Sequence, residues 1–177
     1  MLVYDYYLRG LACGTPGQDR DQYFMAERRV DGLPTTLKRP YRIDWRGDPP
    51  HMLPPDIPIW WRFLETWKHE VKTLYYDCLL GGPYFTEEEL QDPIKKSWQY
   101  VNSKRPDAII ETEREVWIIE VSANPGLRAI GQLIAYQALW LEDPKIAKIE
   151  RPVLIVETLD TDLGAAAARM GALIFVV

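Results

Sequence analysis

The chain has 177 residues, of which 47% are hydrophobic and 27% charged, and its formal net charge is −5. This length and composition fit one globular domain with additional chain. The acidic balance argues against a protein that coats nucleic acid non-specifically, because such a protein needs a basic surface to neutralise phosphates. Two cysteines cannot form a disulfide framework. No stretch has the roughly 20 apolar residues of a membrane span, and the N-terminus lacks a signal-peptide pattern, so we expect an intracellular, cytoplasmic protein.

Residues 1–58 contain eight of the fourteen prolines. Proline at this density interrupts helices and central strands, which predicts an extended arm with a short strand near residues 2–8 and a short helix near residues 20–30. The arm also carries more aromatic and aliphatic side chains than a disordered tail usually holds. We therefore expect it to make most of its contacts outside its own domain and to bind partner proteins.

From residue 59 to residue 177 the hydrophobic pattern becomes regular and predicts an α/β domain. Apolar residues at steps of three and four predict one long helix over residues 59–82, and Thr86 predicts the N-cap of a short turn that Pro93 stops. Three strands, a helix, a strand, a helix and a strand follow, at 97–102, 107–112, 116–122, 125–143, 151–160, 161–171 and 172–177. Crossover helices make the last strands parallel, so we expect a mixed central sheet flanked by helices.

Two carboxylates are the strongest candidates for chemistry, since Asp107 opens one predicted strand and Glu120 lies inside the next. Alternation along the strand places Glu120 on the same face as Ser122. A glutamate among isoleucines in a buried strand is costly unless it is paired or bound to a metal. The two carboxylates predict a site for Mg²⁺ or Mn²⁺ that keeps waters and takes a phosphate. The alternative is a structural ion pair with Arg105 or Arg128.

The helix predicted after these strands carries a polar stripe, with Arg128, Gln132 and Tyr136 at steps of four, and Asn124 and Pro125 at its start. We expect this stripe to lie over the site, where it would meet a phosphate backbone. The other side of the helix is predicted to be apolar, through Leu127, Ile130, Leu133, Ile134 and Leu141.

These features resemble the PD-(D/E)XK nuclease superfamily over residues 59–160. Pro106–Asp107 opens the second strand and Glu120 lies on the third, as in the family motif, and Gln132 with Tyr136 matches the Gln-x-x-x-Tyr pattern of many members. The predicted order of helix, three strands, helix and strand is that of the family core, here with a terminal helix and strand added. The resemblance implies a restriction-endonuclease-like fold and metal-dependent DNA cleavage, with Asp107 and Glu120 as ligands.

Ser122 departs from the family pattern, which has a lysine at this position. The family's lysine orients or activates the attacking water and offsets charge in the transition state. Arg128, one turn into the next helix, is the expected substitute, although it stays protonated and is a poor general base. The family often adds a carboxylate from the first helix, and here Glu70 is preferred over Glu65 as a metal ligand because Glu70 borders the apolar stripe.

Three functions are left open by these features. We favour a degenerate nuclease fold used as a structural or adaptor component of a large assembly, such as a virion, because the lysine is missing, the chain is acidic and the arm is aromatic. The second function is an active Mg²⁺-dependent DNA nuclease, and the third is a module that binds nucleic acid without cleaving it. The two histidines, His51 and His69, are predicted to be solvated.

Overall fold

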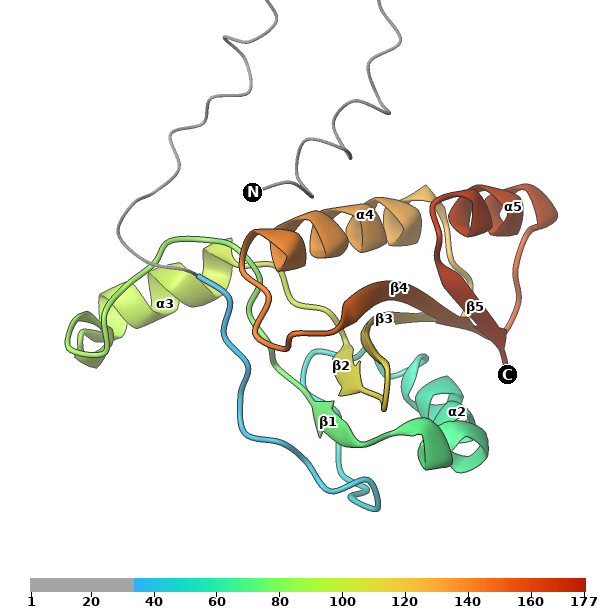
Figure 1. Ribbon diagram of the computed structural model, residues 1–177, viewed down its shortest axis with the longest axis horizontal. Coiled ribbons are helices and arrows are strands. Elements are labelled where there is room, and N and C mark those ends of the chain that lie inside the picture. Colours follow the sequence, from blue (N-terminus) through green and yellow to red (C-terminus); the bar gives the residue numbers. More distant parts are fainter. Residues whose placement is uncertain (1–33) are drawn as a thin grey trace, which may run out of the picture. The chain divides into compact units, whose positions relative to one another are not determined.

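Five strands form a mixed sheet in the part of the chain that the computed structural model describes, residues 34–177 (Figure 1). The strands are β1 (Thr73–Tyr75), β2 (Ala108–Glu111), β3 (Glu115–Ser122), β4 (Ile149–Val156) and β5 (Leu173–Val176). They lie side by side in sequence order; β1, β2 and β3 pair antiparallel, whereas β3, β4 and β5 pair parallel. The predicted mixed sheet and its parallel final strands are confirmed.

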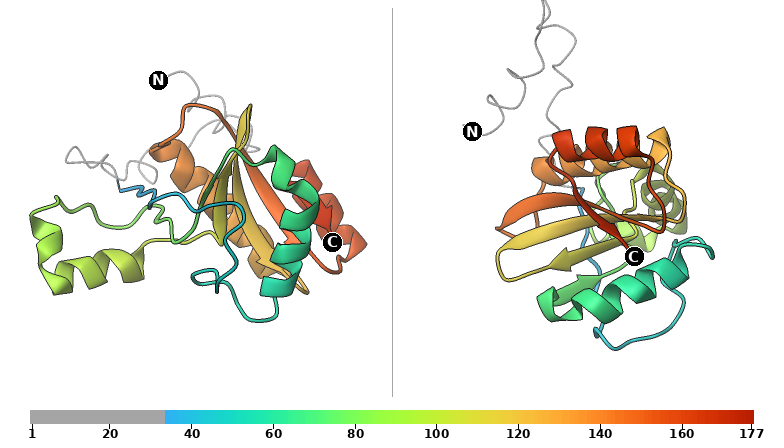
Figure 2. Two further views of the ribbon diagram at one scale, coloured as in Figure 1. Left: turned by 90° about the horizontal axis from the view of Figure 1, so that it is seen from below. Right: turned by 90° about the vertical axis from the view of Figure 1, so that its right-hand side faces the viewer.

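The helices enclose this sheet in two layers. They are α2 (Ile57–Trp67), α3 (Pro93–Asn102), α4 (Leu127–Glu142) and α5 (Thr161–Arg169), with short 3₁₀ turns η1 (Lys68–Glu70) and η2 (Glu89–Gln91). Helix α2 covers one face of the sheet, α4 and α5 cover the other, and α3 projects to one side (Figure 2). Each helix in residues 34–177 is too short or too polar to cross a lipid bilayer.

Alternation along β3 sends its side chains into both layers. Trp117, Ile119 and Val121 join the core beneath α2. Val116 and Ile118 join a second core with residues of α4. Since both faces of β3 are buried, a polar residue in this strand is removed from water, and Glu120 is such a residue.

The described end of the proposed arm packs on this same domain. Thr36 pairs with Leu79 and Tyr41 with Leu74 in isolated antiparallel bridges. The rings of Tyr41 and Trp45 meet at a centroid distance of 4.9 Å, and both side chains pack against the core beneath α2. The expectation that residues 34–58 contact mainly other molecules is therefore wrong, because their aromatic side chains complete the domain's own core. The strand and helix predicted near residues 2–8 and 20–30 lie outside the described residues.

The prediction of one long helix over residues 59–82 holds for the first half of that range and is wrong for the second half. Helix α2 ends at Trp67, and residues from Thr73 onward form β1. Burial alternates with a period of two from Thr73 to Cys78. Because Leu74 and Cys78 are four residues apart, their spacing suits a helix and one face of a strand equally, and tertiary pairing with β2 decides for the strand.

Residues 97–102, predicted as a strand, belong to helix α3. The Asp92 carboxylate accepts a hydrogen bond from the Ile94 amide at 2.8 Å and Pro93 follows the cap, which together start the helix. The N-cap residue of η2 is Glu88 rather than the predicted Thr86, but the expected capping hydrogen bonds are formed: the Thr86 hydroxyl accepts from the Glu89 amide, and the Glu89 carboxylate accepts from the Thr86 amide. Proline therefore marks the beginning of a helix here rather than the end of the preceding turn.

Helix α4 begins at Leu127, two residues later than predicted, and its N-cap residue Gly126 provides no side-chain hydrogen bond. The predicted cap at Asn124 is not used, because residues 123–126 carry the chain from the end of β3 into the helix layer.

Replacing Tyr76 by phenylalanine should destabilise the domain. The Trp60 indole N–H donates to the Tyr76 hydroxyl at 2.6 Å, and both side chains are fully buried. Without its acceptor the indole N–H stays buried and unsatisfied, which costs about 1–3 kcal/mol. Urea unfolding monitored by tryptophan fluorescence measures this loss, with Tyr84→Phe, a change at a partly exposed ring, as the control. Equal stabilities of the two variants would contradict the assigned role of this hydrogen bond.

Candidate functional site

The register of β2 and β3 brings Asp107 and Glu120 together. Ala108 pairs with Ile119 in this antiparallel ladder, so one further step sets Asp107 opposite Glu120. Directly opposed residues have Cβ atoms about 4.5–5.5 Å apart. Both side chains lie on the face covered by α4, because Ile109 and Ile118, two residues away from each, pack with Tyr136 of that helix.

Two aspartates complete the hydrogen bonding of β3 where β2 no longer accompanies it. The Val121 amide donates to Asp107 Oδ2 at 2.7 Å, and the Ala123 amide donates to Asp56 Oδ1 at 2.7 Å. Each carboxylate satisfies one backbone donor with one oxygen and retains a second oxygen. Asp56 is the N-cap residue of α2, yet its side chain serves Ala123 rather than the helix.

Sequence reasoning missed Asp56 because it assigned this residue to the arm. An aspartate two residues before Pro58, at the start of a regular apolar stripe, is a helix N-terminus signal that would have placed it on the domain.

The helix α4 side of the site is formed by Tyr136 and Gln132. The Gln132 amide donates to the Tyr136 hydroxyl at 2.9 Å, and that hydroxyl donates to the Arg105 carbonyl at 3.0 Å. The predicted stripe thus lies over the site, but Tyr136 is buried in the core rather than on a solvent-facing side.

The apolar side predicted for α4 is wrong at two positions. Leu127 is 83% exposed and Ile134 is 51% exposed. The sheet lies beneath a different set of residues, which comprises Ala129, Ile130, Leu133, Tyr136 and Trp140. A helix of mixed apolar and small residues has no sharp boundary between its faces, so periodicity alone misplaces its orientation by part of a turn.

Both carboxyl groups hold protons more tightly than usual. Burial raises the pKa of Asp107 to about 7; the Val121 amide opposes this rise, and the charge of Asp56 adds to it. Burial also raises the pKa of Glu120 to about 8, with a further contribution from the charge of Asp107. The Tyr136 hydroxyl and the Arg128 charge oppose that rise. The two groups titrate as a pair, because ionising one makes ionisation of the other harder.

The ion pair considered from the sequence is not formed. In residues 34–177 no lysine or arginine nitrogen lies within 4.0 Å of an Asp107 or Glu120 oxygen. Arg128 is exposed and acts on Glu120 only through its field. Ser122 lies two residues beyond Glu120 and pairs with Val156 of β4, and a serine there brings no charge.

Glu70 lies away from this site. It belongs to the turn that precedes β1, and its contact is His69 at 3.5 Å. The first residue of β1, Thr73, pairs with Glu111, the last residue of β2. Asp107 precedes the other end of β2, so about 13 Å of strand separates the two ends.

The donor set fits a divalent cation that is only partly coordinated by protein. No group of three histidine, cysteine or acidic side chains within residues 34–177 is arranged to hold a metal ion. Asp107 and Glu120 supply two hard oxygen ligands. Mg²⁺ commonly binds through one or two carboxylates while keeping waters and substrate oxygens, and this donor set matches that mode.

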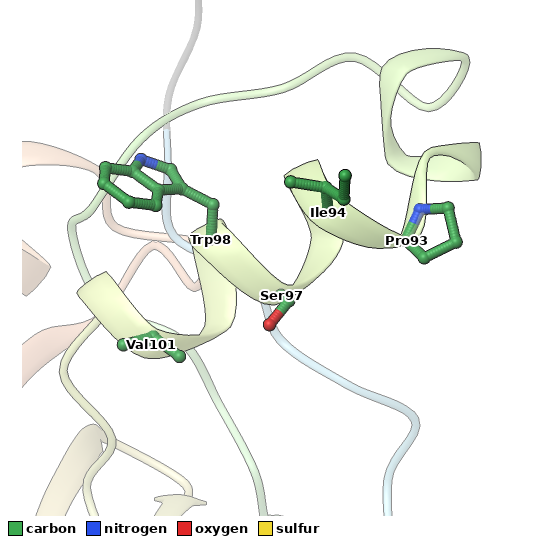
Figure 3. A pocket seen from close by; sticks show the side chains of 5 residues that line it. All are labelled: Pro93, Ile94, Ser97, Trp98 and Val101. Carbon is green, nitrogen blue, oxygen red and sulfur yellow. The ribbon is translucent and has the colours of Figure 1, made fainter.

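A separate apolar surface lies on α3. An open hollow of about 350 Å³ is lined by Pro93, Ile94, Ser97, Trp98 and Val101, all on this one helix (Figure 3). Ile94, Trp98 and Val101 are 77%, 61% and 72% exposed. The spacing of these three side chains, four and then three residues, forms one face of the helix.

Comparisons with protein-family models, with curated proteins and with solved structures gave no match. The resemblance to PD-(D/E)XK nucleases therefore stays a prediction.

The carboxylate pair should make stability fall as pH rises. A carboxyl group with a raised pKa in the folded state binds more protons folded than unfolded, so its stabilising contribution is complete below the unfolded pKa and is lost as pH rises through about 7 for Asp107 and 8 for Glu120. Each extra bound proton changes the free energy of unfolding by up to about 1.4 kcal/mol per pH unit.

Urea unfolding between about pH 5 and pH 8, in chelator, measures this slope. Glu120→Gln should flatten it, whereas Glu113→Gln, at an exposed position in the β2–β3 turn, should leave it unchanged. A wild-type slope no steeper than that of Glu120→Gln would refute the assignment.

Proposed function

We propose that this chain is a divalent-cation-dependent phosphodiesterase that cleaves nucleic acid, of the PD-(D/E)XK kind and slowed by Ser122. The observation that carries the proposal is the opposition of Asp107 and Glu120 on neighbouring strands. It supports an active site more strongly than the degenerate structural role favoured by the sequence.

The physical reason is the free energy of holding two acidic groups together. A buried carboxylate without a cationic partner is unfavourable, and a second one beside it raises the penalty through repulsion. A domain used only for its shape gains nothing from such a pair, since one apolar residue in β3 would be more stable. A bound divalent cation removes both penalties at once.

The side chains around the pair have separable roles in this proposal. Asp107 and Glu120 hold Mg²⁺ or Mn²⁺, which when bound acts as a Lewis acid on the phosphate and lowers the pKa of a bound water. Gln132 and Tyr136 fix the Glu120 side of the site. Arg128 provides positive charge for the phosphate.

Ser122 explains why the proposed activity is slow. A serine hydroxyl at this position can donate a hydrogen bond to water or phosphate, but it cannot balance the charge that develops there. Stabilisation of that developing charge then depends on Arg128, which occupies an exposed position on α4.

A second candidate function is a non-catalytic component of an assembly. The exposed apolar face of α3, with Ile94, Trp98 and Val101, favours it. Apolar helix faces of this kind are typical of protein-binding surfaces.

A nicking assay separates the two functions. Supercoiled plasmid DNA incubated with the purified protein and Mn²⁺ should be converted slowly to the open circular form. Asp107→Asn and Glu120→Gln should abolish nicking, and Arg128→Ala should reduce it by about 10²–10³-fold, as for loss of one transition-state charge contact. Glu70→Gln, which changes a carboxylate away from the site, is the matched control and should cut like wild type.

Ser122→Lys should increase the rate of nicking, because it adds a positive charge beside the two metal ligands, Asp107 and Glu120. Plasmid that stays intact with every variant, together with no Mn²⁺ binding by calorimetry, would reject the nuclease and leave the assembly component. Tight DNA binding without nicking in the presence of bound Mn²⁺ would instead identify a non-cleaving module.

A further inference from the structure

A second polar cluster lies outside the carboxylate pair and is centred on Arg105. Its other members are His51, Asp77 and Tyr100, so that four separate segments of the chain converge on it. None of the roles proposed above uses these side chains.

The imidazole of His51 connects the cluster. Its Nε2 lies 2.9 Å from Asp77 Oδ1, and Arg105 Nη1 lies 3.0 Å from His51 Nδ1. The same guanidinium nitrogen lies 2.9 Å from His51 Nε2, so Arg105 lies along the edge of the imidazole ring. The Tyr100 hydroxyl also hydrogen-bonds His51, and the Arg105 guanidinium stacks on the Tyr100 ring with its carbon 4.4 Å from the ring centroid. Asp77 and His51 thus hold Arg105 in one orientation.

The backbone at this cluster is strained. His51 has a φ of 66° and Asp77 a φ of 54°, and they are the two non-glycine residues with positive φ in residues 34–177. Side-chain-bearing residues occupy this left-handed region at a cost in free energy, and such outliers concentrate at functional sites. That both outliers meet, with His51 Nε2 2.9 Å from Asp77 Oδ1, indicates a constructed site.

Arg105 retains unused donors. Arg42, Arg62 and Arg151 each pair with a carboxylate, whereas Arg105 has no carboxylate oxygen within 4.0 Å in the described chain. Only Nη1 is engaged, so Nε and Nη2 have no partner among residues 34–177. A partly buried guanidinium, stacked on an aromatic ring and with two free N–H edges, suits a bidentate anion.

Arg105 also lies next to the carboxylate pair. It is two residues before Asp107, and its carbonyl accepts the hydrogen bond of the Tyr136 hydroxyl, which borders Glu120. An anion held by Arg105 is therefore near any phosphate held at the pair.

We propose that Arg105, positioned by His51 and Asp77 and stacked on Tyr100, binds a backbone phosphate of the nucleic acid adjacent to the one that is cleaved. This inference rests on the proposed function, because it takes the neighbouring carboxylate pair as the cleavage site. Arg105 is a binding residue, while His51, Asp77 and Tyr100 are positioning residues. A polynucleotide is the ligand because its phosphates repeat along the strand, so two neighbouring sites can hold two of them.

The test measures binding of a short fluorescein-labelled DNA duplex by anisotropy, in chelator, over a series of salt concentrations. Arg105→Gln should weaken binding by about tenfold, as expected for loss of one charge-assisted bidentate contact. It should also reduce the slope of log affinity against log salt by about 0.9, the contribution of one phosphate contact. Arg114→Gln is the matched control, because Arg114 is exposed in the turn between β2 and β3, at the opposite end of the strands from Asp107, and it should leave both quantities unchanged.

Two further variants guard against a purely structural effect. Arg105→Lys keeps the charge and should retain the salt slope while losing part of the affinity. Tyr100→Leu should weaken binding and leave the salt slope close to wild type, because it removes the stacking surface and no charge. Thermal unfolding verifies that each variant is folded, and if Arg105→Gln does not fold, Arg105→Ala, which also removes the charge, replaces it with the same expected loss of affinity and of salt slope.

The outcomes distinguish this inference from the function on which it rests. Wild type that binds Mn²⁺ and nicks DNA, with Arg105→Gln indistinguishable from Arg114→Gln in affinity and salt slope, overturns the phosphate site alone. Wild type that binds neither Mn²⁺ nor DNA overturns the proposed function as well. Loss of affinity in Arg105→Gln at an unchanged salt slope also overturns the inference, because a phosphate contact must change the slope.

Discussion

Because β2 and β3 pair antiparallel with Ala108 opposite Ile119, the residues one step beyond, Asp107 and Glu120, face each other at the same end of the sheet. This single register determines most of the site. A shift by one residue would turn Glu120 into the layer beneath α2, where it would meet Phe63 and Trp60 of the other core. The buried residues on either side of Glu120 in β3 prevent that shift, since both faces of the strand are filled. The opposition of the carboxylates is thus enforced by hydrophobic packing.

The same strand end shows how acidic residues serve structure and chemistry together. Val121 and Ala123 have amides beyond the reach of β2, and carboxylates of Asp107 and Asp56 accept their hydrogen bonds. Each contact holds an acidic side chain in place through one of its oxygens. Binding of a ligand therefore costs these side chains little further conformational entropy. The network on the α4 side, from Gln132 through Tyr136 to the Arg105 carbonyl, connects the carboxylate pair with the Arg105 cluster through a buried side chain.

Sequence reasoning succeeded where local pattern and tertiary context agree. The last three strands, with their crossover helices, were predicted because long apolar runs bounded by turn residues leave few alternatives. Asp107 and Glu120 were placed on neighbouring strands because they lie in two consecutive apolar runs, and the alternation of side chains along a strand gave the face on which Glu120 lies. It failed where two periods coincide, as for Leu74 and Cys78, which suit a helix and a strand alike. His51 is exposed, as predicted, but it is also hydrogen-bonded to Tyr100 and Arg105, which are 49 and 54 positions away, and no local pattern records such contacts.

The sequential order of the strands has a consequence for the kinetics of folding. The β2–β3 hairpin closes through a turn of three residues, so its formation costs little loop entropy and Asp107 and Glu120 meet early. Helix α4 reaches the sheet only when the β3–β4 crossover is in place, and its arrival desolvates the pair. Repulsion between the carboxylates is therefore strongest after most of the chain has condensed. A cation that relieves it then acts mainly by slowing unfolding, and hardly on the rate of folding, so occupancy of the site would be expressed in the lifetime of the folded domain.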